Sequence, residues 1–425
     1  MTNLNNIPQG YKMTPLGIIP DEWKVKTLDY FGEIYSGGTP NTEIGEYWNG
    51  DISWCTPSDV TKLTTKYIWN TEVKITKKGL KESSAKLLPP QSVIVCTRAT
   101  IGYSAISKTD ICTNQGFKNI VPSKDVVSEW LYYIITYSKP RLARLGCGST
   151  FLEVSKKDFS KFKVATPLVV EQRRIAEILN TWDKAIEKQT LFIEKLELRK
   201  KGLMQQLLTE KKRLPGFSGE WKKAKLKDAT IFLSTNSFSR EQLNSVKGNV
   251  LNIHYGDVLV KYSSVLDASK ENIPYINEQI EYSPKDYVNN GDVIMADTAE
   301  DEMVGRCCEV INIDNIKVVS GLHTILIHPI IKFAPKYLGY YLNSERYHKQ
   351  IISIMQGIKV YSITKDALKN TIIDIPNIEE QAAIANILSL CDNEILLAKQ
   401  KLNEFHQQKK GLMQVLLTGK KRVTQ

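Results

Sequence analysis

The chain has 425 residues, of which 42% are hydrophobic and 24% are charged, so it has room for two or three folded domains and is not a disordered or collagen-like chain. Its net charge of +11 favours a polyanionic partner. No apolar run reaches the roughly 18 residues that a membrane span needs, and "MTNLNNIPQGYK" at the start lacks a signal-peptide core, so we expect a cytoplasmic protein with no membrane partner.

Residues 1–166 are predicted to form an α+β domain of short strands, turns and one late helix. The turn "SGGTPNT" (Ser36–Thr42) precedes the strand-like stretch "SVIVCTRATIGYSAI" (Ser92–Ile106). "EWLYYIITYSKPRLARL" (Glu129–Leu145) has the apolar spacing of a helix. A domain of this size has a core of its own.

Residues 167–214 are predicted to form one long helix. Its apolar positions recur in alternating steps of three and four, a heptad pattern typical of a coiled coil. Gln189 and Lys200 interrupt this apolar seam. The seam positions are Ile175, Leu179, Trp182, Ile186, Ile193, Leu196, Leu203 and Leu207.

Residues 215–375 are predicted to form a second α+β domain. "DVIM" (Asp292–Met295) reads as a strand after the turn "VNNGD", and "PKYLGYYLNSERYHKQIISIM" (Pro335–Met355) reads as a helix. Residues 215–374 contain 18 basic and 19 acidic residues, so a nucleic-acid surface in this domain is a local patch. Asp301 and Glu302 are interpreted as part of a solvated loop rather than an acid/base pair.

Residues 376–425 are predicted to form a second long helix with the same heptad pattern. Asn377 followed by Glu380 resembles a capping box at its start. Gly202 and Gly411 each occupy the same place in "KKGLMQ" and indicate either a close approach between the helices or a helix end. The seam positions are Ile384, Leu388, Cys391, Ile395, Ala398, Leu402, Phe405, Leu412 and Leu416, with Lys409 as the interruption.

The two long helices are copies of one segment. Residues 167–214 and 376–423 align without a gap, and 21 of the 48 positions are identical. The duplication extends upstream, because "EWK" at Glu22–Lys24 returns at Glu220–Lys222. The order is therefore domain, helix, domain, helix, in which the domains have diverged more than the helices. We expect the two helices to pair with each other.

Several kinds of chemistry find no support in the sequence. No Gly-x-x-x-x-Gly-Lys-Ser/Thr loop is present for nucleotide phosphates, and Pro89-Pro90 lacks the neighbours that amino-methyltransferases place around such a pair. Seven cysteines show no Cys-x-x-Cys spacing, so we predict no metal site and expect reduced, buried thiols. The sequence thus predicts no catalytic residue.

Loops that mix glycine, threonine and asparagine with cations are the candidates for nucleic-acid contact. Backbone amides and hydroxyls bind phosphates, and Arg, Lys, Asn and Gln side chains read base edges, although each loop taken alone is also consistent with an ordinary turn. In the first domain the candidates are Ser36, Gly37, Gly38, Thr39, Thr97, Arg98, Thr100, Asn114, Gln115 and Lys118. In the second they are Asn236, Arg240, His254, Tyr255, Arg306, His323, Lys359 and Tyr361.

The layout and motifs together resemble the specificity (S) subunit of bacterial type I restriction-modification systems. The resemblance rests on the helix entries at Pro167–Leu179 and Pro376–Leu388, on "SGGTP", "TNQGF" and "GSTFLEVS" (Gly148–Ser155), and on "IHYGD" and "SGLHT". It implies two target recognition domains, one for each half of a bipartite asymmetric DNA site, separated by an antiparallel coiled coil in a pseudo-twofold arrangement.

The resemblance also implies that this chain performs no chemistry. Two modification subunits are expected to bind it and to methylate adenine with S-adenosylmethionine, and restriction subunits are expected to add ATP- and Mg-dependent translocation and DNA cleavage. The near-neutral second domain departs from a uniformly basic DNA-binding surface. Either it uses few contacts, among them Arg240, Arg306 and Lys359, or the modification subunits supply much of the phosphate binding.

Two other classes of protein remain as alternatives. One is a coiled-coil scaffold whose globular domains bind protein rather than DNA, and the polar loops with their cations favour DNA over it. The other is a self-contained nuclease or methyltransferase, which the missing motifs speak against.

Overall fold

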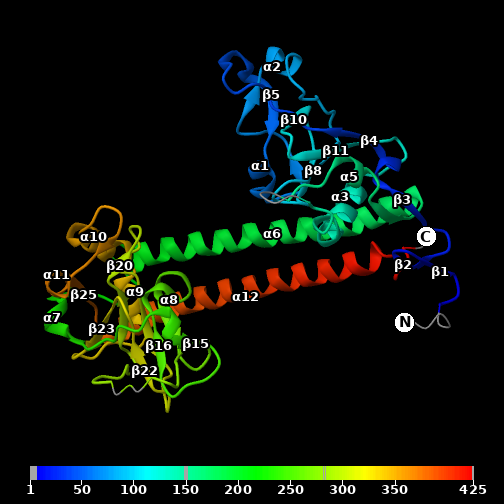
Figure 1. Ribbon diagram of the computed structural model, residues 1–425. Coiled ribbons are helices and arrows are strands. Elements are labelled where there is room, and N and C mark those ends of the chain that lie inside the picture. The colour runs from blue at the N-terminus through cyan, green and yellow to red at the C-terminus, as the bar shows by residue number, and fades with distance from the viewer. Residues whose placement is uncertain (1–6, 148–151, 281, 283, 424–425) are drawn as a thin grey trace. The chain divides into compact units, whose positions relative to one another are not determined.

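The computed structural model describes residues 7–147, 152–280, 282 and 284–423, which fall into two compact units (Figure 1). The first unit contains residues 1–192 and 398–425, and the second contains residues 193–397. The two longest helices, α6 (Val169–Leu207) and α12 (Ile378–Leu416), each contribute residues to both units. None of the helices in the described residues has an apolar stretch long enough to cross a membrane.

A five-stranded sheet forms the centre of the first unit, in the order β4-β11-β8-β9-β6. The central strand β8 is buried along its whole length because "VIVC" is apolar on both faces. Helix α3 packs against β8 and β9. The strands are β1 (Tyr11–Thr14), β2 (Gly17–Pro20), β3 (Lys24–Thr27), β4 (Gly32–Ser36), β5 (Trp48–Cys55), β6 (Tyr67–Ile68), β7 (Lys74–Ile75), β8 (Val93–Cys96), β9 (Ser104–Ser107), β10 (Ile111–Thr113), β11 (Phe117–Pro122) and β12 (Lys163–Thr166). The short helices are α1 (Pro57–Thr61), α2 (Lys77–Lys81), α3 (Ser128–Tyr137), α4 (Lys139–Ala143) and α5 (Lys156–Ser160).

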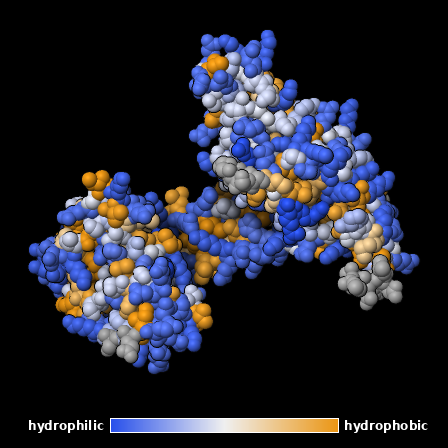
Figure 2. Space-filling view, in the orientation of Figure 1, coloured by the Kyte–Doolittle hydropathy of each residue, from blue (hydrophilic) through white to orange (hydrophobic). Residues whose placement is uncertain are grey.

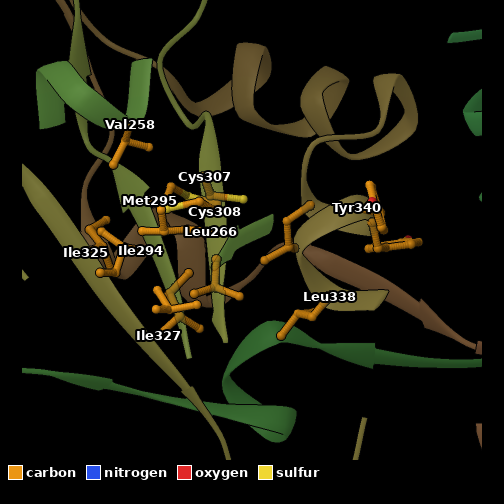
Figure 3. Close-up of a cluster of buried hydrophobic side chains, with 14 of the residues drawn as sticks. Val258, Leu266, Ile294, Met295, Cys307, Cys308, Ile325, Ile327, Leu338 and Tyr340 are labelled. Carbon is orange, nitrogen blue, oxygen red and sulfur yellow. The ribbon is translucent and has the colours of Figure 1, made fainter. Parts of the chain in front are cut away.

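The second unit repeats this sheet in the order β14-β23-β19-β21-β17. Every pair of neighbours has the same direction as in the first unit, including one parallel pair at the edge, β6 with β9 and β17 with β21. Figure 3 shows its core, with Ile294, Cys308 and Ile327 from three adjacent strands. The strands are β13 (Lys222–Lys225), β14 (Thr230–Leu233), β15 (Leu243–Asn244), β16 (Leu251–Ile253), β17 (Val265–Asp267), β18 (Tyr275–Ile276), β19 (Val293–Ala296), β20 (Thr298–Ala299), β21 (Cys307–Ile311), β22 (Val318–Ser320), β23 (Thr324–Pro329), β24 (Tyr361–Ser362) and β25 (Ile372–Ile375). The short helices are α7 (Leu226–Ala229), α8 (Tyr255–Val260), α9 (Tyr337–Leu342), α10 (Glu345–Ile354) and α11 (Lys365–Lys369).

The α+β prediction is confirmed, but each helix predicted within a domain is in fact two helices. In the first unit α3 ends before Ser138, and α4 begins with Pro140 in its first turn, a position that suits proline. In the second unit Ser344 separates α9 from α10, and its hydroxyl accepts a hydrogen bond from Tyr347 N–H (3.2 Å). Apolar spacing continues across both breaks, so it does not reveal them.

Helices α6 and α12 pack together antiparallel, as predicted. In the first unit the rings of Trp182 and Phe405 meet edge to face with centroids 5.7 Å apart, and Gln189 Nε2 donates to Ala398 O (3.0 Å). Most of the predicted seam side chains are buried and the others are half-buried. The polar interruptions of the seam therefore lie between the helices, where each finds a polar partner.

Both roles predicted for Gly202 and Gly411, a helix end or a close approach between the helices, are wrong. Both helices continue for five residues beyond Gly202 and Gly411, so these residues do not mark helix ends. A Cβ atom built on either glycine meets nothing within 4 Å, so they do not mark a close approach between the helices. Nothing in the described residues explains them.

A buried carboxylate at the start of α6 joins three distant parts of the first unit. Trp23 Nε1 donates to Glu171 Oε2 (3.0 Å), and Arg422 Nε donates to Glu171 Oε1 (2.8 Å). We call this arrangement of tryptophan, glutamate and arginine the clasp. It ties the first strands and the segment after α12 to the beginning of α6.

The second unit contains an equivalent clasp. Trp221 Nε1 and Arg213 Nε donate to the two oxygens of Glu380, at 3.2 and 2.7 Å. The predicted capping box is half present, because Asn377 Oδ1 accepts from Glu380 N–H (2.8 Å). The side chain of Glu380 is engaged in the clasp instead of reaching back to the cap.

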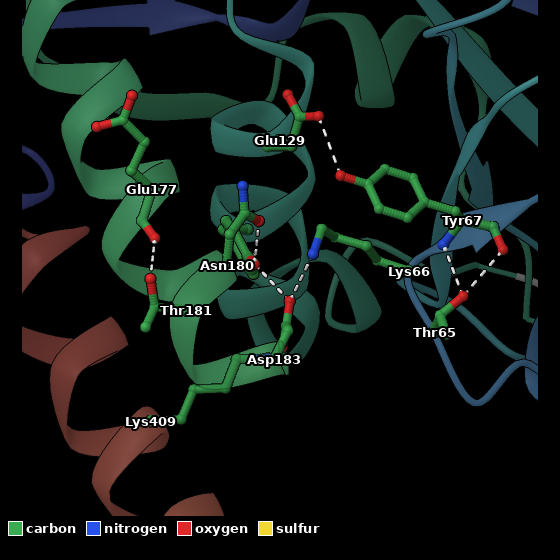
Figure 4. Close-up of polar contacts among 10 residues, drawn as sticks. Thr65, Lys66, Tyr67, Glu129, Glu177, Asn180, Thr181, Asp183 and Lys409 are labelled. Atoms are coloured by element: carbon green, nitrogen blue, oxygen red, sulfur yellow. Dashed lines mark hydrogen bonds and ion pairs between the residues drawn. The ribbon is translucent and has the colours of Figure 1, made fainter. Parts of the chain in front are cut away.

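Asp183 of α6 fastens the globular part of the first unit to the helix pair (Figure 4). Its carboxylate pairs with Lys66 Nζ (2.8 Å) and with Lys409 of α12, and Tyr133 donates its hydroxyl to it. Lys66 is only 7% exposed. Burial alone would raise the pKa of Asp183, but the two lysines outweigh burial and lower the pKa from its ordinary value.

In the second unit Asp392 takes the place of Asp183. It pairs with Lys200 (2.5 Å) and accepts from the hydroxyl of Tyr340 (2.7 Å). Ser264 stands where the first unit has Lys66, because the backbone carbonyl of each accepts a hydrogen bond from the equivalent strand. Glu309 N–H donates to Ser264 O (3.0 Å), and Ile106 N–H donates to Lys66 O (2.8 Å). The second unit thus has one cation fewer at this carboxylate.

Six of the seven cysteines are buried, as expected, whereas Cys147 is exposed, which that expectation did not include. Burial raises the pKa of Cys96 to about 12, so its thiol stays protonated at neutral pH. Within the described part of the chain, no three His, Cys, Asp or Glu side chains are grouped so that they could hold a metal ion.

Candidate nucleic-acid interface

Two of the predicted loops in the first unit lie directly against each other. The loop after β4 meets the loop between β10 and β11, where Gly38 N–H donates to Thr113 O (2.9 Å). A Cβ atom on Gly37 would lie 1.9 Å from Asn114 O, so only glycine allows this approach. The first glycine of "SGGTP" is therefore explained by the packing of one loop on the other. The second is explained by the chain at Ser84, whose carbonyl carbon would lie 2.4 Å from a Cβ atom on Gly38.

The predicted loop after β8 joins the same group. Thr97 donates its backbone N–H (2.8 Å) and its hydroxyl (3.2 Å) to Gly116 O. Gly116 N–H donates to Asn114 Oδ1 (2.9 Å), and Thr39 donates its hydroxyl to Gln115 Oε1. The turn "NQG" is thus held between two loops that are about sixty residues apart in the sequence.

A hollow of about 210 Å³ opens where these loops meet. Gln115 is exposed at this hollow, while Arg98 and Asn114 are half-buried. Their side chains supply the amide and guanidinium groups that read base edges or bind phosphates. The hollow is lined by Pro57, Arg98, Ala99, Asn114, Gln115 and Gly116.

The other predicted residues of the first unit lie beside this group or support it. Lys118 is 5% exposed, and its Nζ pairs with Glu153 Oε1 (3.3 Å), while Arg98 Nε lies 4.0 Å from the other oxygen of Glu153. Ser36 stands opposite Lys118 in the β4–β11 pair. Thr100 is half-buried and donates its N–H to Arg98 O (2.7 Å). Lys118 therefore positions the loops from below the surface.

In the second unit the structure brings three predicted rings together, and we call His254, Tyr255 and His323 the ring cluster. Ring centroids are 4.7 Å apart for His254 and Tyr255, and 5.3 Å apart for Tyr255 and His323. Burial, and after it the charge of Arg240, lowers the pKa of His254. Because its Nδ1 accepts from Gly256 N–H (3.2 Å), the neutral ring carries its proton on Nε2.

Two further predicted residues of the second unit are engaged within the protein. Both terminal nitrogens of Arg240 donate to Asp257, each at 2.8 Å, and this pairing raises the pKa of Arg240. The amide of Asn236 donates to Asn252 Oδ1 (2.6 Å) and Ser320 O (2.9 Å). Arg240 is half-exposed, but its charge is balanced by the carboxylate that it holds.

The remaining three predicted residues do not form one group. Arg306 donates to Leu259 O (2.7 Å) and Tyr262 O (3.3 Å), at the far end of α8 from the ring cluster, so it stabilises the end of that helix. Lys359 is exposed in the loop before β24, and Tyr361 begins that strand. Arg306 thus has a structural contact that its sequence context did not reveal.

Acidic partners are the residues that the sequence interpretation missed. Glu153 and Asp257 hold the cations of their loops, and both lie in motifs that were singled out, "GSTFLEVS" and "IHYGD". A carboxylate inside a loop selected for its cations is the signal that could have identified them. Gly148–Phe151 of the first motif lie outside the described residues. The visible face of each unit is mainly polar (Figure 2), so hydrophobicity does not mark the interface.

Residues 20–197 and 218–407 of the chain match the protein family described as the type I restriction modification DNA specificity domain. Each match covers one of the two copies, including most of the long helix that follows it.

Similar proteins are specificity subunits of type I restriction enzymes. Over 194 residues, 44% of this chain and 45% of the relative, it is 41% identical to the MjaIX specificity subunit of Methanocaldococcus jannaschii. It is 25% identical to the MjaVIII specificity subunit of the same organism over 95% of this chain and 94% of that one. The EcoR124I/EcoR124II specificity subunit of Escherichia coli is 31% identical over 188 residues, which are 42% of this chain and 45% of that one.

Two solved structures share the fold. The type I restriction-modification S subunit from M. genitalium superposes with a TM-score of 0.53 at 13% identity, covering 100% of this chain and 99% of the other. A chain from a structure that describes complex assembly and conformational transition of the type I R-M system superposes with a TM-score of 0.61 at 17% identity, covering 94% and 99%.

Proposed function

Because the chain belongs to the family of type I restriction-modification DNA specificity proteins, the non-catalytic subunits of their enzymes, we propose that its two units each read one half of a bipartite, asymmetric DNA target. The observation that carries this proposal is the repetition of one fold with different loops. Both units have the same sheet order, yet the first presents amides and a guanidinium around a hollow, and the second presents the ring cluster. Because the two units present different side chains, each is expected to recognise a different half-site sequence.

The reading chemistry follows from the side chains that reach the surface. In the first unit Gln115 and Asn114 have the amide groups that form paired hydrogen bonds with adenine in the major groove. In the second unit the exposed imidazole of His323 offers ring nitrogens for a base edge, and exposed Lys359 offers a charge for a phosphate. The glycines and buried ion pairs beneath these groups keep them in place.

The chemistry itself belongs to partner subunits in this proposal. Two modification subunits bring S-adenosylmethionine and methylate adenine in each half-site, and restriction subunits use ATP and Mg for translocation and cleavage. The antiparallel pair of α6 and α12 then sets the distance between the two readers. Since the substrate is cellular DNA, the complex works in the cytoplasm.

Replacing Gln115 with alanine is expected to relax one base position in one half-site and to leave the other half-site unchanged. Loss of a paired contact to a base costs about 1–3 kcal/mol of discrimination, which is roughly 5- to 150-fold. Sequencing of methylated adenines in cells that express the chain with its modification subunits measures this directly. His323→Ala in the other unit is the matched variant and should alter only the other half-site. If either variant changed both halves, the assignment of one unit to each half would be wrong.

Salt dependence is expected to differ between the free chain and its complex with modification subunits. Arg240 and Arg306 are both engaged inside the second unit, so two of the three cations predicted to contact DNA there are already bound within the protein. The slope of log affinity against log salt should therefore be shallower for the free chain than for the complex. Titration of one duplex that contains the mapped target measures both slopes, and equal slopes would contradict a contribution from the modification subunits.

A further inference from the structure

A short loop of the second unit, residues Gln356–Ser362, has a fixed conformation. Gln356 N–H donates to Ser362 O (2.9 Å), and Ser362 N–H donates to Gln356 O (2.8 Å), which closes the loop at its base. Gly357 has φ +126°, and a Cβ atom on it would lie 1.9 Å from Val360 O. Because only glycine fits there, the loop presents its remaining side chains in a defined way.

The tip of this loop carries exposed branched apolar side chains beside a cation. Ile358 is 92% exposed and Val360 is 52% exposed, and Lys359 between them is exposed as well. At that exposure Ile358 contributes nothing to the core of the unit. A rigid loop with an outward isoleucine and an adjacent lysine suits a partner that offers methyl groups beside anions.

The loop is continuous with the ring cluster. Its last residues form β24, which pairs with β20, and Ile363 N–H donates to Asp297 O (2.9 Å). Asp297 N–H in turn donates to His323 O (3.1 Å), and Thr298 Oγ1 lies 3.5 Å from His323 Nδ1. One segment, Asp297–Thr298, thus holds both the loop and a member of the ring cluster.

The first unit has an equivalent pair of backbone hydrogen bonds at the same place in its fold. Cys147 and Glu153, 209 residues before Gln356 and Ser362, exchange the same pair of backbone hydrogen bonds (3.1 and 3.0 Å). The enclosed sequences are "GSTFL" and "GIKVY", which share only the glycine. An equivalent frame with different side chains is the pattern expected where two half-sites are distinguished.

Resting on the proposed function, we infer that the Gln356–Ser362 loop determines specificity in the second half-site, with Ile358 against the 5-methyl group of a thymine in the major groove and Lys359 on a neighbouring phosphate. The thymine methyl is the apolar feature of the major-groove edge, and apolar side chains read it by contact. This assigns a role to Ile358, an apolar residue that is not among the predicted DNA-contacting residues.

The test uses the complex of this chain with its modification subunits and the target mapped by methylation. Each thymine of the second half-site is replaced in turn by deoxyuridine, which removes only the methyl group. At one position the wild-type complex should bind about four-fold more weakly, as expected for one buried methyl. The Ile358→Ala complex should bind both duplexes equally. Val260→Ala, at a 78% exposed valine beyond the ring cluster, is the control and should behave like the wild type.

The outcomes separate this inference from the proposed function. If the complex recognises its target but no thymine shows a methyl effect that Ile358→Ala removes, the assignment of Ile358 is wrong and the proposed function stands. If Ile358→Ala instead weakens assembly with the modification subunits, the loop is a protein contact and the inference is also wrong. If the complex neither methylates nor binds a specific sequence, the proposed function itself fails.

Discussion

Asp183→Asn is expected to lower the free energy of unfolding of the first unit by about 3 kcal/mol, because it leaves two enclosed lysines without a counter-charge. Lys66 is 7% exposed and Lys409 is 20% exposed. A loss of this size lowers the melting temperature by roughly 6–12 °C in a unit of about 200 residues. Calorimetry together with hydrogen exchange along α6 measures the loss and locates it.

The matched variant is Asp392→Asn in the second unit. Its carboxylate has one lysine partner, Lys200, where Asp183 has two, so its replacement should cost less stability. An equal or larger loss for Asp392→Asn would contradict the role assigned to Lys66.

The wild type is expected to be more stable than Asp183→Asn at neutral pH and to lose this difference in stability at acidic pH. The folded-state pKa of Asp183 is lowered, so its ion pairs stabilise the fold above the unfolded pKa of about 4. This stability is lost as the pH falls from about 4 through the lowered folded pKa. Melting curves of both proteins at neutral and acidic pH should therefore converge at the acidic end.

Deleting one heptad from each long helix is expected to shorten the unread spacer of the DNA target by about three base pairs and to leave both half-site sequences unchanged. Residues 184–190 of α6 and 393–399 of α12 are suited to this, because both lie between the ion-paired aspartate and lysine of their own helix. A heptad of helix is about 10 Å long, and DNA rises about 3.4 Å per base pair. Methylation mapping reads the spacer and the half-sites in one experiment.

Removing residues 184–190 alone is the control, since it shifts the register of one helix against the other and should abolish assembly or methylation. Altered half-sites in the double deletion would show that the helices do more than set the spacing.

Local patterns in the sequence predicted the elements whose causes are local. The heptad seam identified both long helices and their mutual packing, because burial on one helical face imposes a period on the residues themselves. The breaks in the predicted helices at Ser138 and Ser344 were not predicted, because the apolar spacing continues across them. Gly202 and Gly411 attracted two explanations, and the structure supports neither.

Contacts between distant segments could not be predicted from local pattern. Glu171 meets Trp23 and Arg422, which are 148 and 251 residues away. The signal was nevertheless present, since the tryptophan of "EWK", the glutamate four residues after the proline at each helix entry and the arginine of "KKR" recur in both copies. The candidate DNA-contacting loops were predicted one at a time, from the composition of each. Only the fold shows that Thr39 donates a hydrogen bond to Gln115, and that Arg306 binds the end of α8.

The clasp of the first unit has a consequence for the order in which the protein matures on the ribosome. Residues 1–192 are made first, but their unit also needs residues 398–425, including the Arg422 that closes on Glu171. The second unit is complete within residues 193–397, with Arg213 already facing Glu380. The unit that is synthesised first therefore completes its fold last. Until residues 398–425 have been made, Glu171 at the start of α6 lacks Arg422, the cation that pairs with it in the folded unit.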